Sequence, residues 1–213
     1  MKYDQKLIVM DTETGGLPDK LKKQATIEVA LTEIACVVID NESLTITEKV
    51  SWLITPYAGD LIYDKCAEQV SGISQDLLKK EGQPIEQVYA KLKEVFIKGK
   101  AGRNKPIIFF HNKSFDTPFI ENLFKLFNDD LYKWIDRVED TMEWARLKWV
   151  ENPKFTLAAC AERCQIDQQQ VHRALPDTIV TAQLVIKFLK DFRSEGSNSP
   201  EGKQKKFRDH FKF

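Results

Sequence analysis

The stretch that decides the fold is Leu7-Ile8-Val9-Met10-Asp11-Thr12-Glu13-Thr14-Gly15-Gly16. Four apolar residues followed by two carboxylates and a Gly pair predict a buried strand that ends in a chemical site. Side chains alternate between the faces of a strand, so Asp11 and Glu13 project to the same side. Acids this close repel each other, and a fold tolerates them mainly where a hard cation such as Mg2+ or Mn2+ lies between them. For this segment alone, a solvated strand end is an equal alternative.

The composition is that of one globular domain. The chain has 213 residues, of which 42% are hydrophobic and 30% are charged. Its formal net charge is zero, so a nucleic-acid partner would have to be attracted by bound metal or by a local basic patch. No segment resembles a signal peptide or is apolar enough to span a bilayer. We therefore expect a cytoplasmic protein with no membrane partner.

The order of the predicted elements indicates an α/β fold. Strands are expected in the opening stretch and at 29–39, 44–54, 106–110 and 135–138. Helices are expected at 64–70, 74–80, 84–97, 114–127, 141–149, 155–164 and 177–192. A hairpin followed by strands that alternate with helices predicts a mixed five-stranded sheet flanked by helices. Residues 1–193 would form this domain.

Two further acids are expected at the starts of helices. Asp116 follows the fourth strand, near the positive end of a helix that Ser114 would cap. Asp177 follows Pro176, which suits a first helical turn. Taken alone, Asp116 could simply complement the helix dipole. His172 belongs to the loop before the last helix, where it is either a surface residue or a general base.

Three segments resemble the motifs of DEDDh exonucleases, the relatives of the bacterial polymerase proofreading subunit, RNase T and oligoribonuclease. They are Asp11-Thr12-Glu13-Thr14-Gly15, Asn112-Lys113-Ser114-Phe115-Asp116 and His172-Arg173-Ala174-Leu175-Pro176-Asp177. Val70-Ser71-Gly72-Ile73-Ser74 resembles a substrate-facing segment of the family, and 139–141 and 155–158 match weaker positions. The sequence departs from the family in an apparent insertion at 20–28 and in Ser71, where the family often has His.

The resemblance implies a ribonuclease-H-like fold that releases nucleoside 5′-monophosphates from the 3′ end of DNA or RNA, as in proofreading or DNA repair. It implies that Asp11, Glu13 and Asp177 hold one Mg2+ or Mn2+ with the attacking water. Asp11 would bridge to a second ion, which Asp116 would bind through water. Two ions about 4 Å apart can clamp the attacking and leaving oxygens. His172 would take the proton of the water.

The resemblance also implies a surface that holds the terminal nucleotides of a single strand. Its members would be Thr14, Gly15, Leu17, Ser71, Ile73, Asn112 and Phe115. Packing and stacking do not depend on base identity, so little sequence preference is expected.

Two other functions compete with this interpretation. An endonuclease of the same fold also gathers acids around two metals, although His172 in a loop before a helix argues against it. An oligonucleotide with a blocked 3′ end would separate the two activities. A catalytically inactive binding or scaffold module would be expected to have lost an acid or the histidine, and all five residues are present.

The four cysteines are interpreted as structural thiols. Cys36, Cys66, Cys160 and Cys164 form no CxxC pair. Cys160 and Cys164 lie one helical turn apart, where two metal ligands could sit, but nothing nearby completes a set of four.

The last residues form a separate segment of different composition. Residues 194–202 have the composition of a flexible linker, and residues 203–213 hold five basic residues and one acid, with Phe207, Phe211 and Phe213 among them. Three hypotheses remain open for residues 203–213: a docking peptide for a replication partner, an arm that grips single-stranded nucleic acid, or a tail that folds back onto the domain.

Overall fold

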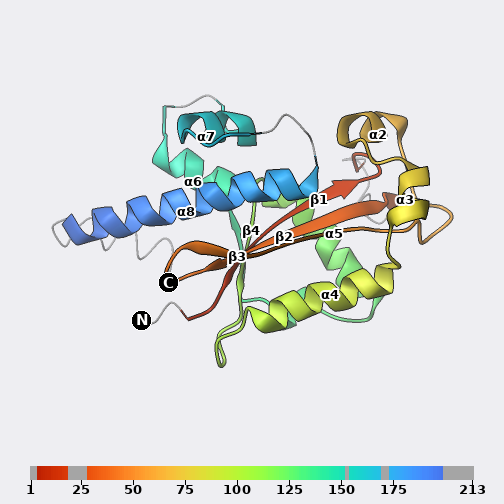
Figure 1. The fold of residues 1–213 in the computed structure, drawn as a ribbon, viewed down its shortest axis with the longest axis horizontal. Coiled ribbons are helices and arrows are strands. Elements are labelled where there is room, and N and C mark those ends of the chain that lie inside the picture. The colour runs from red at the N-terminus through yellow and green to blue at the C-terminus, as the bar shows by residue number, and fades with distance from the viewer. Residues whose placement is uncertain (1–3, 19–27, 152–153, 169–172, 199–213) are drawn as a thin grey trace.

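The computed structural model describes residues 4–18, 28–151, 154–168 and 173–198. Its centre is a five-stranded sheet in the order β3-β2-β1-β4-β5 (Figure 1). The strands are β1 (Leu7–Thr14), β2 (Leu31–Asp40), β3 (Thr45–Leu53), β4 (Ile107–Phe110) and β5 (Val138–Asp140). The first three strands pair antiparallel, whereas β4 is parallel to β1 and β5 is parallel to β4. The predicted mixed sheet is confirmed.

The central strand β1 is apolar on both faces because helices cover both sides of the sheet. Leu7 and Val9 contribute to one core, and Ile8 and Met10 contribute to the other. All four side chains are buried. This explains the unbroken apolar run in the sequence, which is typical of strands covered on both faces.

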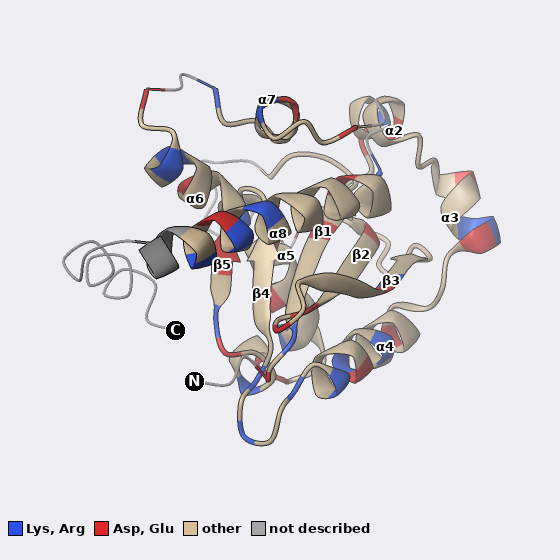
Figure 2. Ribbon diagram, turned by 60° about the vertical axis from the view of Figure 1, so that its left-hand side comes forward, with Lys and Arg blue, Asp and Glu red and all other residues tan. Residues whose placement is uncertain are grey.

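Helices form a layer on each face of the sheet (Figures 1 and 2). One face is covered by α8 (Ala174–Asn198), with α6 (Thr141–Lys148) and α7 (Leu157–Arg163) beside it. The other face is covered by α4 (Ile85–Lys98) and α5 (Lys113–Leu126). The short helices α2 (Lys65–Ser71) and α3 (Gln75–Glu81) stand near the carboxyl end of β1, and the one-turn 3-10 helix η1 (Leu131–Lys133) precedes β5.

Two predicted elements have wrong boundaries. The fifth strand begins at Val138 instead of residue 135, although Ile135 is still buried in the core. The last helix runs from Ala174 to Asn198, so residues 194–198 are helical where a linker was predicted. A helix that is already formed gains one backbone hydrogen bond for each added residue, which can carry it into a segment of low propensity. Pro176 lies in the first turn and costs no hydrogen bond there.

The N-cap residue of α5 is Asn112 and not the predicted Ser114. Asn112, with a positive φ of 74°, is the N-cap residue, and the Ser114 hydroxyl donates to Asn112 Oδ1 at 2.8 Å instead of capping the helix. The backbone amides of Asn112 and Lys113 donate to the carboxylate of Asp140 at 2.9 and 3.1 Å. A distant acid therefore satisfies amides that a local cap would otherwise satisfy. Pro118 lies inside the helix.

The cysteines differ in their burial. All four cysteines are free thiols, and Cys36 and Cys160 are buried in opposite cores. Among the described residues, the one group that could hold a metal contains no cysteine. In the part of the chain that the structure describes, no helix is both long and apolar enough to cross a membrane.

Candidate active site

Three carboxylates meet where β1 approaches α8. Asp11 and Glu13 lie on one face of β1, and Asp177 lies in the first turn of α8, which packs against β1 and β2. One oxygen atom of each carboxylate lies within 4.8 Å of those of the other two. The structure therefore brings together the three residues that were predicted to share one cation.

Asp116 approaches β1 from the α5 side. Its side chain is buried, with an exposed fraction of 3%. Its Oδ1 accepts hydrogen bonds from the backbone amide and from the hydroxyl of Thr12, at 3.0 and 2.7 Å. Asp116 lies outside the three-carboxylate group. Its orientation is fixed by Thr12, the residue between Asp11 and Glu13 on β1.

Burial and mutual repulsion disfavour the charged form of these acids. Burial raises the pKa of Asp11, and the charges of Asp116 and Glu13 raise it further. Burial, then the charges of Glu33 and Asp177, raises the pKa of Glu13 to about 7. Burial raises the pKa of Asp116 to about 7 despite its hydrogen bonds from Thr12. An all-oxygen donor set with these pKa shifts fits a hard divalent cation, which would stabilise the ionised carboxylates.

The residues predicted to hold substrate have differing exposures. Leu17 is 83% exposed, Asn112 is exposed and Phe115 is half-buried, tilted against Phe119. In contrast, Ser71 and Ile73 are buried. The Ser71 hydroxyl donates to the carbonyl of Ala67 at 2.9 Å and accepts from the amide of Ile73 at 3.2 Å. The bonds of Ser71 stabilise the end of α2.

Thr14 and Gly15, two other residues predicted to hold substrate, are also held by hydrogen bonds. The hydroxyl of Thr14 is buried and donates to the carbonyl of Gly16 at 2.7 Å. The amide of Gly15 donates to the carbonyl of Ala30 at 2.7 Å. The backbone that follows β1 is therefore held in one conformation.

Two histidines need to be distinguished. His172, the predicted general base, lies outside the described residues. His111 follows β4, and its two ring nitrogens contact Thr141 Oγ1 at 2.8 Å and the carbonyl of Phe155 at 2.9 Å. Burial lowers the pKa of His111, so the neutral ring donates from Nε2 to the Phe155 carbonyl. His111 therefore holds the start of α7 in place.

A family model described as Exonuclease, RNase_T, matches residues 8–185. The chain belongs to this exonuclease family. Its acids and the order of its motifs make it a member of the DEDDh type.

Relatives of this exonuclease include much longer proteins. It is 28% identical over 193 residues to the PolC-type DNA polymerase III of Bacillus cereus and 26% identical over 194 residues to that of Bacillus subtilis. In each case 91% of this chain is covered but only 12% of the relative. Escherichia coli exonuclease I in complex with a dT13 oligonucleotide matches with a TM-score of 0.72 and 18% identity, covering 90% of this chain and 44% of that chain. The exonuclease shares the fold of exonuclease I.

The close approach of the backbone after β1 makes Gly15 sensitive to substitution. A Cβ atom at Gly15 would overlap the carbonyl oxygen of Ile62. We expect Gly15→Ala to lower the free energy of unfolding of the exonuclease by about 1–3 kcal/mol, because the loop segment that contains Ile62 would have to move. Urea denaturation would measure this change. Gly59→Ala is the matched control, because a Cβ there meets nothing within 4 Å; equal losses in both variants would contradict the prediction.

The raised pKa values predict how the stability of the metal-free exonuclease depends on pH. Glu13 has a pKa of about 7 in the folded state against 4.5 as its ordinary value, so between these values the folded state binds more protons than the unfolded state. Stability is therefore highest at low pH within this window and is lost as the pH rises through about 7. A hydrogen bond from Lys6 lowers the pKa of Asp40, and one from Tyr89 lowers the pKa of Asp129. These two acids therefore change the stability mainly below their ordinary pKa of 3.8, outside this window.

We therefore expect the melting temperature in EDTA to fall between about pH 5 and about pH 8, and the fall to be smaller with Mg2+. Differential scanning fluorimetry over this range would measure both. A melting temperature that rises with pH in EDTA would show that the acids are ionised without a cation.

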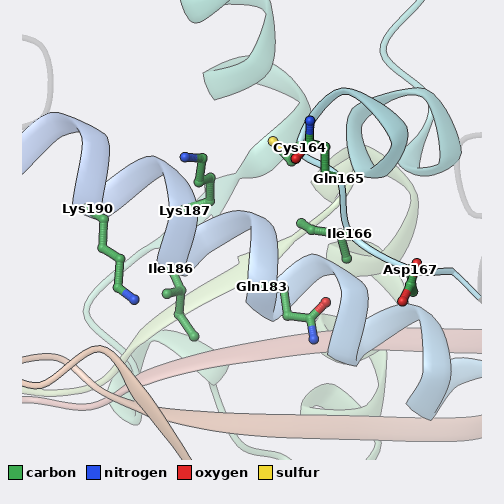
Figure 3. A pocket seen from close by; sticks show the side chains of 8 residues that line it. All are labelled: Cys164, Gln165, Ile166, Asp167, Gln183, Ile186, Lys187 and Lys190. Atoms are coloured by element: carbon green, nitrogen blue, oxygen red, sulfur yellow. The ribbon is translucent and has the colours of Figure 1, made fainter.

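One hollow on the surface is lined by none of the candidate active-site acids. A shallow hollow of about 440 Å³ lies beside the middle turns of α8 (Figure 3). It is lined by Cys164, Gln165, Ile166, Asp167, Gln183, Ile186, Lys187 and Lys190. None of these residues belongs to the acid group, which lies where β1 meets the first turn of α8.

Sequence reasoning missed the role of Glu33, which accepts hydrogen bonds from Arg173 and Ala174 at the start of α8. Its partners are about 140 residues away along the chain, so no local pattern marks it. Asp140, in a segment that matches a weaker family position, caps α6 and also accepts from the first amides of α5.

Proposed function

We propose that this exonuclease removes nucleoside 5′-monophosphates from the 3′ end of single-stranded DNA or RNA. The observation that carries the proposal is the meeting of Asp11, Glu13 and Asp177 within 4.8 Å, with Asp116 fixed to the same strand. Without a cation, this cluster would repel a phosphodiester. Its composition supports metal-dependent hydrolysis rather than binding alone.

The acids and the histidine would have separate tasks. Asp11, Glu13 and Asp177 would hold one divalent cation, and Asp11 with Asp116 a second. When bound, Mg2+ or Mn2+ would supply Lewis-acid activation of water and stabilise charge on the phosphate. His172 would accept the proton of the attacking water as a general base. The Thr12 bonds to Asp116 keep that carboxylate from rotating away from β1.

The surface around the acids would hold the last nucleotides through apolar and main-chain contacts. Leu17, exposed beside Gly16, and the half-buried ring of Phe115 offer packing surfaces for bases. The buried Ser71 and Ile73 would support this surface from below rather than contact bases directly. Such contacts would discriminate little between bases.

Digestion of matched DNA and RNA strands with 5′ labels would test the proposal. With Mg2+ or Mn2+, we expect shortening from the 3′ end in single-nucleotide steps, and no cleavage in EDTA. A 3′-blocked strand should survive. Internal cleavage of the blocked strand would support an endonuclease, and tight binding without turnover would support a binding module; either result would overturn the proposal.

Residues 203–213 carry a separate proposal, a contact with nucleic acid or with a replication partner. They lie outside the described residues. Deletion of 203–213 would separate the hypotheses: weaker and less salt-dependent substrate binding would indicate an arm on nucleic acid. Unchanged kinetics would agree with docking to a partner, whereas a lower melting temperature would show that the segment stabilises the domain.

A further inference from the structure

Glu33 is a buried acid on β2 that faces the active site without belonging to the carboxylate group. Its exposed fraction is 2%. In the antiparallel pairing of β1 with β2, Glu33 lies directly opposite Glu13. Directly opposed side chains on neighbouring strands are in contact range, and like charges in this arrangement are destabilising. An acid at this position therefore needs a partner.

That partner is the first residue before α8. Arg173 donates from Nε to Glu33 Oε2 at 2.9 Å and from Nη2 to Glu33 Oε1 at 3.0 Å. The backbone amide of Ala174 donates to the same Oε2 at 3.2 Å. This two-pronged contact fixes orientation as well as distance, because the planar guanidinium matches the carboxylate at two points. Glu33 thus anchors both the side chain of Arg173 and the start of α8.

The anchor is connected to a proposed metal ligand through one helical turn. The carbonyl of Arg173 accepts the first helical hydrogen bond, from the backbone amide of Asp177, at 3.2 Å. The residue that binds Glu33 therefore also fixes the turn that carries the Asp177 side chain. Sliding or tilting of this turn would move Asp177 relative to Asp11 and Glu13, which are held by the sheet.

We propose that Glu33 and Arg173 are a positioning pair that sets Asp177 at the correct distance from Asp11 and Glu13 for divalent-cation binding. This inference rests on one part of the proposed function, namely that Asp11, Glu13 and Asp177 bind a divalent cation. Glu33 does not bind the cation itself. Loss of a residue that orients a metal ligand lowers metal affinity or activity by about 10–100-fold.

Arg173→Lys tests the geometry without changing the charge. A lysine keeps the positive charge but cannot make the two-pronged contact. We expect its affinity for Mn2+, measured by isothermal titration calorimetry well below the unfolding temperature, to fall by about 10-fold or more. Hydrolysis should weaken at limiting Mn2+ and recover partly at high Mn2+. A role that is only structural would lower the melting temperature and leave the Mn2+ affinity unchanged.

A double variant and a control complete the test. Glu33→Gln with Arg173→Met removes both charges, so the net local charge is kept, and we expect weaker Mn2+ binding here too. Asp40→Asn is the control: it breaks the 2.6 Å ion pair with Lys6 at the far end of the same strand and should leave Mn2+ affinity unchanged. Calorimetry also separates this inference from any effect on the neighbouring His172, which would alter the rate but not metal binding.

The outcomes separate the two proposals. A wild-type protein that neither binds Mn2+ nor hydrolyses nucleic acid would overturn the proposed function. A wild-type protein that does both, together with an Arg173→Lys variant that is folded by circular dichroism and binds Mn2+ equally well, would overturn the positioning role alone.

Discussion

Asp11→Asn and Asp177→Asn are each expected to lower kcat by at least about 10³-fold, which corresponds to about 4 kcal/mol of lost transition-state stabilisation. An amide has nearly the volume of a carboxylate but no charge, so the substitution removes cation binding without emptying the site. Both acids belong to the group whose oxygens lie within 4.8 Å. Single-turnover hydrolysis at saturating Mg2+ would measure the loss.

The same variants should remain folded. Burial, and then repulsion from Asp116, Glu13 and Asp177, raises the pKa of Asp11. Removal of the buried charge relieves both costs, so the metal-free melting temperature at about pH 8 should stay equal or rise. Asp76→Asn is the control, because its side chain on α3 is 95% exposed. If Asp11→Asn kept a rate similar to that control, the assignment of Asp11 as a metal ligand would be wrong.

His172→Ala is expected to lower the rate by about 10²–10⁴-fold, the usual cost of losing a positioned general base. Higher pH should restore part of the activity, because hydroxide can replace the missing base. Measured pH–rate profiles of the wild type and the variant would show this as a steeper rise for the variant.

His111→Gln is the matched control for the histidine prediction. The His111 ring bonds to Thr141 and to the Phe155 carbonyl, so its loss should lower the melting temperature. The shape of its pH–rate profile should match the wild type. Normal activity of His172→Ala at neutral pH would exclude His172 as the base.

Local patterns predicted the sheet and the positions of the four acids. The apolar run before Asp11 predicted a buried strand, and the alternation of side chains put Asp11 and Glu13 on one side. Asp116 and Asp177 were found because each falls in the first turn of a helix, a position that helix-start residues mark.

Contacts between distant segments could not be predicted in this way. Ser114 has the chemistry of a cap, but Asp140 satisfies the amides at the start of α5 from another strand end. In the sequence, Glu33 is a polar residue within a largely apolar strand, and nothing near it indicates its partner Arg173, which lies 140 residues later. Such pairings depend on the packing of whole elements, which propensity and periodicity do not determine.

The separation of Asp11 from Asp177 along the chain determines when, during synthesis, the three-carboxylate group can form. A growing polypeptide contains Asp11 and Glu13 early, but it completes the three-carboxylate group only after α8 has been made and has packed against β1 and β2. At typical translation speeds of about 5–20 residues per second, this interval is roughly 10–30 s. Fragments that end before α8 would carry three of the four acids and no complete cation site, so we expect such fragments to lack nuclease activity.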